Sequence, residues 1–170
     1  MTYTCTIDTP LGVMTVSAEK DALTGLWFID QKYYPTKTDT WIYDPDNPVF
    51  KSLRDWLSEY FSERDPKHEV KLDPQGTPFQ KAIWDLLLEI PMGHVTTYGN
   101  IAKRLAAIQN LSSMSSQAVG GAVGRNPISI LIPCHRVIGV NGSLTGYDGG
   151  LDRKAVLLKL EHTDLPQIKK

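Results

Sequence analysis

The feature that most constrains the fold of this 170-residue chain is a charged stretch at residues 62–78 that carries three prolines. Proline has no backbone N–H and interrupts helices and central strands. On either side of this stretch the hydrophobic residues follow regular patterns, which indicates two small domains. We therefore expect an N-terminal domain, a linker, a C-terminal domain and a tail at residues 1–73, 74–76, 77–163 and 164–170. One short strand, Glu69–Leu72, is predicted just before the linker.

The N-terminal domain is predicted to be a small antiparallel sheet with one helix. Strand-forming residues dominate three segments, residues 3–8, 13–18 and 23–29. Residues 30–48 are polar and carry three prolines, so we expect a loop there. From Val49 to Phe61 apolar residues recur at helical spacing, which predicts an amphipathic helix with an aromatic, core-facing stripe.

The C-terminal domain is predicted to be mostly helical. Thr77 and Pro78 are typical of a helix start, with threonine as the cap. Further helices are expected from Thr96-Thr97-Tyr98 to about Leu105 or Ala106, from about Ser115 to Arg125, and from Asp152 to His162. The pair of short helices resembles a helix-turn-helix, a weak signal by itself because paired helices are common. An apolar strand is expected to end at Ile132.

Cys134 is one of only two cysteines and is followed directly by His135. A cysteine among apolar residues is often only a small buried side chain. A nearby imidazole could instead take the thiol proton and leave a nucleophilic thiolate. Pro133 favours the second interpretation, because it ends the expected strand and places the following residues at a strand end or turn.

The segment Pro133–Val137 resembles the active-site signature of the O6-alkylguanine-DNA alkyltransferases. The resemblance covers about residues 77–162 in order. Its other motifs are Gln117–Ala122, Asn126-Pro127, Gly146–Leu151 and the segment from Lys154 through Leu160-Glu161. It implies an α+β protein with a ribonuclease-H-like N-terminal domain and a winged helix-turn-helix type of C-terminal domain.

The resemblance also implies an activity. An alkyl group would move from O6 of guanine in DNA, and from O4 of thymine, irreversibly onto Cys134, so that each molecule acts once and needs no cofactor. His135 would be the base, Glu161 would orient it, and Asn126 would brace the site. Arg136 is interpreted as structural, buried and paired.

Two further groups of residues follow from the same resemblance. Those that would bind the guanine are Tyr98, Val137, Tyr147 and Asp148. Those that would contact DNA are Thr97, Tyr98, Gln117, Ala118, Gly120, Gly121 and Arg125.

Gln117 departs from the family pattern, since most members carry an arginine there that fills the space vacated by the flipped base. The stretch at 107–116 is also longer than usual. A lesion-binding sensor that transfers weakly or not at all, like the alkyltransferase-like proteins, therefore stays open as an alternative, although those proteins lack the cysteine. An unrelated cysteine hydrolase is a third interpretation, which no motif supports.

Charge is distributed unevenly along the chain. Residues 1–76 carry eight Lys and Arg against thirteen Asp and Glu, a net charge of −5, and residues 77–163 carry eight against five, a net charge of +3. Contact with phosphate is therefore expected in the second half. We expect a monomeric cytoplasmic protein whose partner is double-stranded DNA containing O6-alkylguanine. No membrane segment is expected, and no metal, because the cysteines lack metal-ligand spacing.

Overall fold

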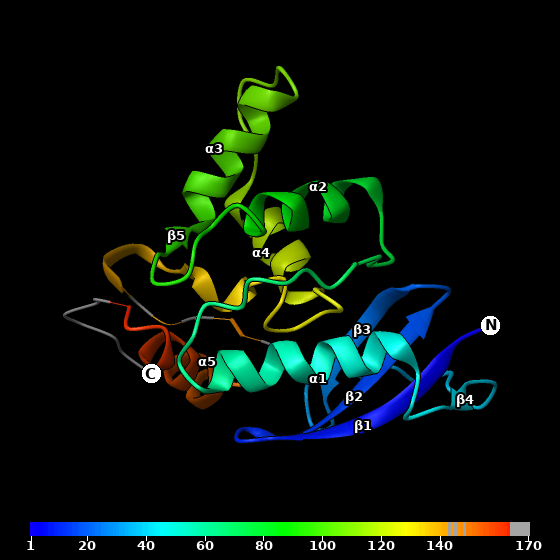
Figure 1. Cartoon of the computed structure of the whole chain (residues 1–170). Coiled ribbons are helices and arrows are strands. Elements are labelled where there is room, and N and C mark those ends of the chain that lie inside the picture. Colours follow the sequence, from blue (N-terminus) through cyan, green and yellow to red (C-terminus); the bar gives the residue numbers. More distant parts are fainter. Residues whose placement is uncertain (143, 145, 148, 164–170) are drawn as a thin grey trace. The chain divides into compact units, whose positions relative to one another are not determined.

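The structure is a computed structural model that describes residues 1–142, 144, 146–147 and 149–163 (Figure 1). It has five α-helices and six short strands among these residues, which confirms the predicted α+β class. The chain divides into two compact units, one of residues 1–75 with 127–129 and the other of residues 76–126 with 130–170. The expected tail at 164–170 lies outside the described residues.

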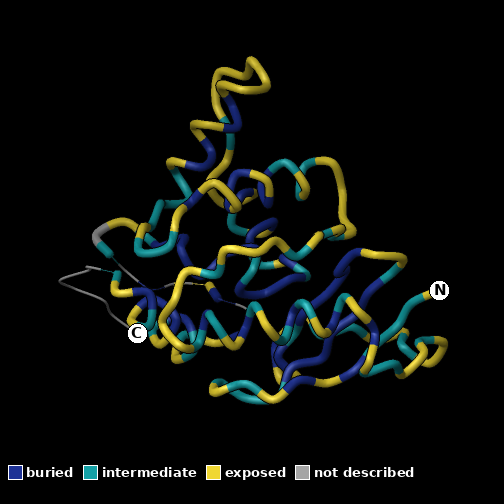
Figure 2. The backbone as a smooth tube through the Cα atoms, in the orientation of Figure 1, coloured by how far each residue is buried: buried dark blue, intermediate teal, exposed yellow. Residues whose placement is uncertain are grey.

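The first unit is built on a sheet with the strand order β3-β2-β1-β4. Three strands form the predicted antiparallel meander: β1 (Tyr3–Thr9), β2 (Gly12–Glu19) and β3 (Ala22–Phe28). Strand β4 (Ile42–Tyr43) pairs in parallel with β1, so the sheet is mixed, and it lies in the segment predicted to be a loop. Figure 2 shows the buried backbone that runs along β2 and β3.

Helix α1 (Pro48–Phe61) packs its apolar stripe against β1, β2 and β3. It begins where the Asn47 side chain accepts a hydrogen bond from the backbone N–H of Val49 at 2.9 Å. The strand predicted at Glu69–Leu72 is wrong, because only Leu72 forms a single bridge, to Leu23 of β3. A strand needs several consecutive paired residues, and here only Leu72 is paired.

The second unit contains four helices, α2 (Pro78–Leu87), α3 (Tyr98–Ile108), α4 (Ser116–Gly124) and α5 (Leu151–Leu160). The predicted Thr77 cap is confirmed, since Thr77 Oγ1 accepts from the Gln80 N–H at 3.1 Å. Trp84 Nε1 of α2 donates to the Ala122 carbonyl of α4 at 2.9 Å, which fixes those two helices against each other.

The strand predicted to end at Ile132 is also wrong. Ile128 forms one bridge to Leu26 within the first unit, and the chain then turns through Ile130, whose φ is +73°. Burial explains the error. Ile128, Ile130 and Ile132 are all buried, and an apolar run that fills the interior looks in the sequence like a buried strand. The turn expected at Cys134–Arg136 is present as the 3-10 helix η1.

After η1 the chain forms β6 (Val137–Ile138), which pairs in parallel with β5 (Thr96–Thr97). A second 3-10 helix, η2 (Val140–Gly142), follows β6. Ile138 packs with Leu144 and with Leu158 of α5, and this small core holds α5 beside η1.

Candidate active site

Cys134 begins η1 and lies almost entirely inside the protein, with 5% of its surface exposed. Its backbone N–H donates to the Ile132 carbonyl at 2.8 Å, and the Arg136 N–H donates to the Pro133 carbonyl at 3.0 Å. These bonds hold the Cys134 thiol on a tight turn, where it is largely shielded from solvent.

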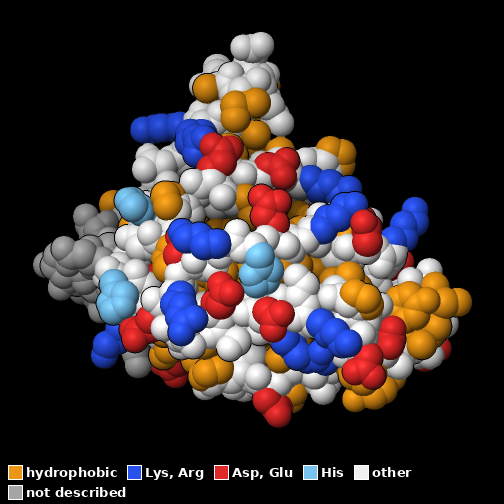
Figure 3. Space-filling model, in the orientation of Figure 1, with side chains coloured by type: hydrophobic (Ala, Val, Ile, Leu, Met, Phe, Trp, Pro, Cys, Tyr) orange, Lys and Arg blue, Asp and Glu red, His pale blue; other side chains and the backbone are white. Residues whose placement is uncertain are grey.

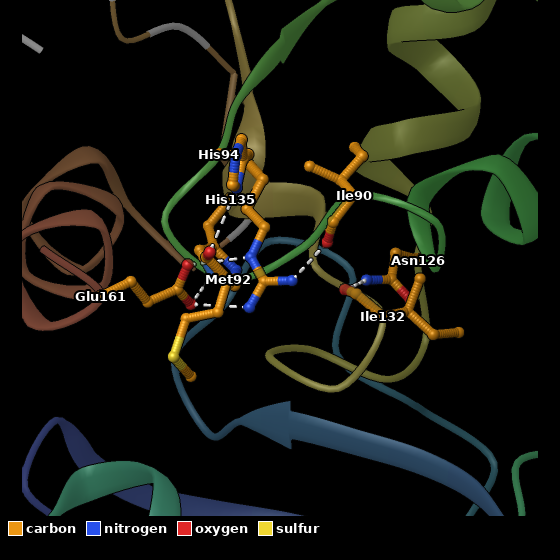
Figure 4. A network of polar contacts seen from close by, with 8 residues as sticks. Ile90, Met92, His94, Asn126, Ile132, His135 and Glu161 are labelled. Atoms are coloured by element: carbon orange, nitrogen blue, oxygen red, sulfur yellow. Dashed lines mark hydrogen bonds and ion pairs between the residues drawn. The ribbon is translucent and has the colours of Figure 1, made fainter. Parts of the chain in front are cut away.

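His135 and Glu161 form a buried pair directly after that cysteine. His135 Nε2 lies 2.6 Å from Glu161 Oε2, and neither side chain is exposed (Figure 4). A carboxylate can only accept, so Nε2 carries the hydrogen and Nδ1 carries the lone pair. Among the described residues Nδ1 has no hydrogen-bond partner. The ring therefore presents a free acceptor, as a general base requires.

Arg136 is buried and paired, as predicted. Its Nε donates to Glu161 Oε1 at 2.8 Å, and its Nη2 donates to Oε2 at 3.1 Å. Its Nη1 donates to the Ile90 carbonyl at 2.6 Å, and the same network is drawn in Figure 4. The guanidinium thus joins the end of α5 to the turn that follows α2.

Burial and the neighbouring charges determine the protonation states of Glu161 and His135 at neutral pH. Burial alone would raise the pKa of Glu161, but the hydrogen bonds from His135 and Arg136 and the charge of Arg136 outweigh it and lower that pKa to about 2. Burial lowers the pKa of His135, the bond to Glu161 opposes this, and the positive charges of Arg136 and Lys154 lower it further. The site therefore holds an ionised Glu161 and a neutral His135.

Lys154 lies beside these residues, although the sequence predicts no role for it in the site. It is fully buried in α5, and its Nζ donates to the Val137 carbonyl at 2.5 Å. Burial lowers its pKa to about 8, against the opposing attraction of Cys134. Helical spacing could have indicated this position, because Lys154 shares one face of the helix with Leu158 and Glu161, which are both buried.

Asn126 lies on the other side of the cysteine turn. Its side-chain amide donates to the Ile132 carbonyl at 2.8 Å, and the residue is buried. Ile132 also accepts the Cys134 N–H, so one carbonyl ties Asn126 to the turn. The bracing role expected for Asn126 is consistent with this contact.

The residues expected to bind guanine come from three segments. Tyr98 begins α3 and is half-buried, and its hydroxyl would lie 3.4 Å from a Cβ at Gly146, whose φ is +62°. Tyr147 is buried, and the Val137 carbonyl faces Lys154. Asp148 lies outside the described residues.

The residues expected to contact DNA lie mainly on α4. Gln117, Ala118, Gly121 and Arg125 are exposed. Gly120 is half-buried, and a Cβ there would lie 3.8 Å from the Tyr98 ring, whereas a Cβ at Gly121 would meet nothing within 4 Å. Thr97 caps α3 through a 3.1 Å bond from the Asn100 N–H.

Charged side chains of both signs are interspersed over the face drawn in Figure 3. Within the described part of the chain, no group of three or more His, Cys, Asp or Glu residues could hold a metal ion. No described helix is long and apolar enough to cross a membrane.

Comparison with known proteins relates both halves of the chain to one family. Residues 78–163 match the DNA binding domain of 6-O-methylguanine DNA methyltransferase, and residues 1–74 match its ribonuclease-like domain. The methylated-DNA–protein-cysteine methyltransferase of Mycobacterium bovis is 42% identical over 161 residues, 95% of this chain and 93% of that protein. The protein of the same name from Methanosarcina mazei is 44% identical over 159 residues, 94% of this chain and 96% of that protein.

Solved structures agree with this relationship. The Mycobacterium tuberculosis O6-methylguanine methyltransferase has a TM-score of 0.82 at 43% identity, covering 95% of this chain and 93% of its own. The Mycobacterium tuberculosis OGT in complex with DNA has a TM-score of 0.82 at 42% identity, covering 94% and 92%. The chain therefore belongs to the 6-O-methylguanine DNA methyltransferase family.

Proposed function

We propose that this protein repairs alkylated DNA by transferring the alkyl group from O6 of guanine, and from O4 of thymine, irreversibly to Cys134. The observation that carries the proposal is the buried His135–Glu161 pair, whose histidine directly follows the buried Cys134 in the sequence and keeps Nδ1 as an acceptor. Relatives named methylated-DNA–protein-cysteine methyltransferase support the same activity.

The transfer is a displacement at carbon. His135 Nδ1 takes the thiol proton, directly or through water, and Cys134 Sγ attacks the alkyl carbon. The bond between that carbon and O6 breaks, its electron pair stays on the guanine, and the proton finally reaches guanine N1. The new thioether has no leaving group to restore the thiol, so each molecule acts once.

A guanine inside a duplex cannot reach a buried thiol, so the nucleotide must rotate out of the stack at a cost of a few kcal/mol. We assign this step to the exposed face of α4, where Ala118 and Gly121 allow close approach to the groove and Gln117 would fill the vacated space. Tyr98, Val137, Tyr147 and Asp148 would hold the flipped base.

The protein is proposed to work as a monomer in the cytoplasm on alkylated double-stranded DNA. All of the proposed catalytic side chains come from one chain. Both cysteines are free thiols, which suits a reducing compartment.

The test is mass spectrometry of the intact protein and of its peptides after incubation with duplex DNA containing O6-methylguanine. We expect a gain of one methylene unit on the peptide that contains Cys134. Cys134→Ser should show no gain, and Cys5→Ser, which removes the other buried thiol, should behave like the parent. Tight binding without any mass gain would contradict transfer and support the sensor alternative instead.

A further inference from the structure

Glu161 is held by more than the histidine it faces. Each of its oxygens accepts from Arg136, Oε1 from Nε at 2.8 Å and Oε2 from Nη2 at 3.1 Å. His135 Nε2 donates to the same Oε2 at 2.6 Å. A two-point contact between a planar guanidinium and a planar carboxylate fixes both planes, so the position of Oε2 is set by Arg136.

The guanidinium is itself tied to the backbone. Its Nη1 donates to the Ile90 carbonyl at 2.6 Å, just after α2 ends. Glu161 follows the last residue of α5, where a helix frays most easily. Arg136 therefore adds two donors to the one that His135 gives this carboxylate.

The charge of Arg136 matters as much as its geometry. A carboxylate alone beside His135 would favour a protonated imidazolium. Arg136 offsets the charge of Glu161, so protonation of His135 would leave an excess positive charge in a fully buried site. The buried Lys154 adds to the same effect.

The other charged residues of the elements packed against η1 lie toward solvent. Helix α2 carries Lys81 and Asp85, which are both exposed. Helix α5 carries Asp152 and Lys159, which are exposed, and Arg153, which is half-buried and donates to the Gly149 carbonyl at 3.1 Å. The charged side chains that govern the protonation of His135 are therefore Glu161, Arg136 and Lys154.

We propose that Arg136 is a positioning residue for the alkyl transfer, which fixes the Nε2–H tautomer of His135 and keeps the ring neutral so that Nδ1 can accept the Cys134 proton. The inference rests on the proposed function for its biological meaning. The effect on the reactivity of the Cys134 thiol does not depend on DNA, so it can be tested with any electrophile.

The experiment follows alkylation of the Cys134 peptide by iodoacetamide between pH 5 and pH 9 in the parent, Arg136→Met and Arg136→Lys. In Arg136→Met the acidic limb of the pH–rate profile should move up by about one pH unit, so that the rate on that limb falls about tenfold relative to the parent. Arg136→Lys keeps the charge without the two-point contact, so its limb should stay near the parent's while the rate falls at every pH.

Arg104→Met is the matched control, because it removes one arginine from the exposed pair with Glu89 and should leave the profile unchanged. A uniform loss of rate in Arg136→Met with an unmoved acid limb would overturn the proposal and leave a structural role only. If Arg136→Met does not fold, nitrogen NMR of the parent decides. An imidazolium, or the Nδ1–H tautomer, at pH 7 would equally overturn it.

Methyl transfer from O6-methylguanine DNA is measured on the parent in parallel. No methyl on Cys134 there would refute the proposed function. The iodoacetamide profiles would still decide the role of Arg136, so the two failures are distinguishable.

Discussion

Glu161 is the buried carboxylate to which both His135 and Arg136 donate hydrogen bonds in the proposed site. It is buried, yet it stays ionised because His135 and Arg136 donate three hydrogen bonds to it. Breaking such a pair by removing one partner leaves the other buried charge uncompensated, which costs several kcal/mol. Glu161 therefore links the chemistry of the site to the stability of the second unit.

This link predicts a specific loss of stability in acid. The pKa of Glu161 is about 2 in the folded state against 4.5 for the free side chain, so the unfolded state takes the proton first. The stabilisation is complete above pH 4.5 and is lost as the pH falls toward 2, on the order of 3 kcal/mol. His135 acts in the same direction below its ordinary pKa of 6.5, because its pKa is also lowered.

Urea unfolding at a series of pH values from 7 to 2 measures the effect. Glu161→Gln should be less stable at pH 7 and should decline less steeply than the parent below pH 4.5. Glu89→Gln is the control, since Glu89 lies in an exposed ion pair and should keep the parental decline. An equal decline in Glu161→Gln and the parent would show that other carboxylates cause it.

At the scale of elements, α4 combines an inner face that packs and an outer face of small or polar residues. Val119, Ala122 and Val123 are buried, and Trp84 of α2 donates to the Ala122 carbonyl. The outer face carries Gln117, at the position where the family resemblance led us to expect arginine. The same helix can therefore be rigidly placed and yet be poorly equipped to flip a base.

Gln117 should make duplex DNA a slower substrate than single-stranded DNA or a free O6-alkylguanine. Gln117→Arg should accelerate the duplex reaction by about tenfold, which corresponds to about 1.4 kcal/mol. The longer, charged guanidinium can reach both the space left by the flipped base and the phosphates. Rates are measured as methyl transfer to Cys134 on all three substrates. Comparable parental rates on the three would contradict the expectation.

A substitution at Gly121 should affect the stability of α4 and the binding of DNA in opposite directions. A Cβ there meets nothing within 4 Å, so Gly121→Ala should stabilise the free protein by up to about 1 kcal/mol through helix propensity. If α4 approaches the groove closely, the same change should weaken duplex binding and leave the reaction with a free O6-alkylguanine unchanged. Thermal unfolding and duplex titration measure the two effects, and unchanged duplex affinity would exclude a close contact at Gly121.

At the scale of the whole molecule, opposite net charges on the two halves limit how strongly it can hold undamaged DNA. Residues 77–163 carry only +3 and residues 1–76 carry −5. Affinity for unmodified duplex should therefore be weak, and its logarithm should fall with the logarithm of salt concentration, with a slope of about −3 if about three phosphates are contacted. Fluorescence anisotropy between 50 and 200 mM salt, as typical working conditions, measures the slope, and a much steeper value would indicate a basic surface beyond this net charge.

Local sequence determined those parts of the protein that depend on near neighbours. Asn47 and Thr77 cap their helices through bonds two or three residues away, so α1 and α2 were predictable from composition and spacing. The turn at Cys134–Arg136 also follows from a local cause, the missing N–H of Pro133. The pairing of Cys134 with His135 and Glu161 was identified through the resemblance to the family.

Tertiary structure alone decided the rest. β4 pairs with β1 from inside a predicted loop, and Leu72 and Ile128 each form a single bridge where strands were expected. Lys154 reaches Val137, and Arg136 reaches both Glu161 and Ile90, across 17 to 46 residues of sequence. Hydrophobic patterns report which residues are buried but not which partner buries them, because burial is non-directional and a hydrogen bond is not.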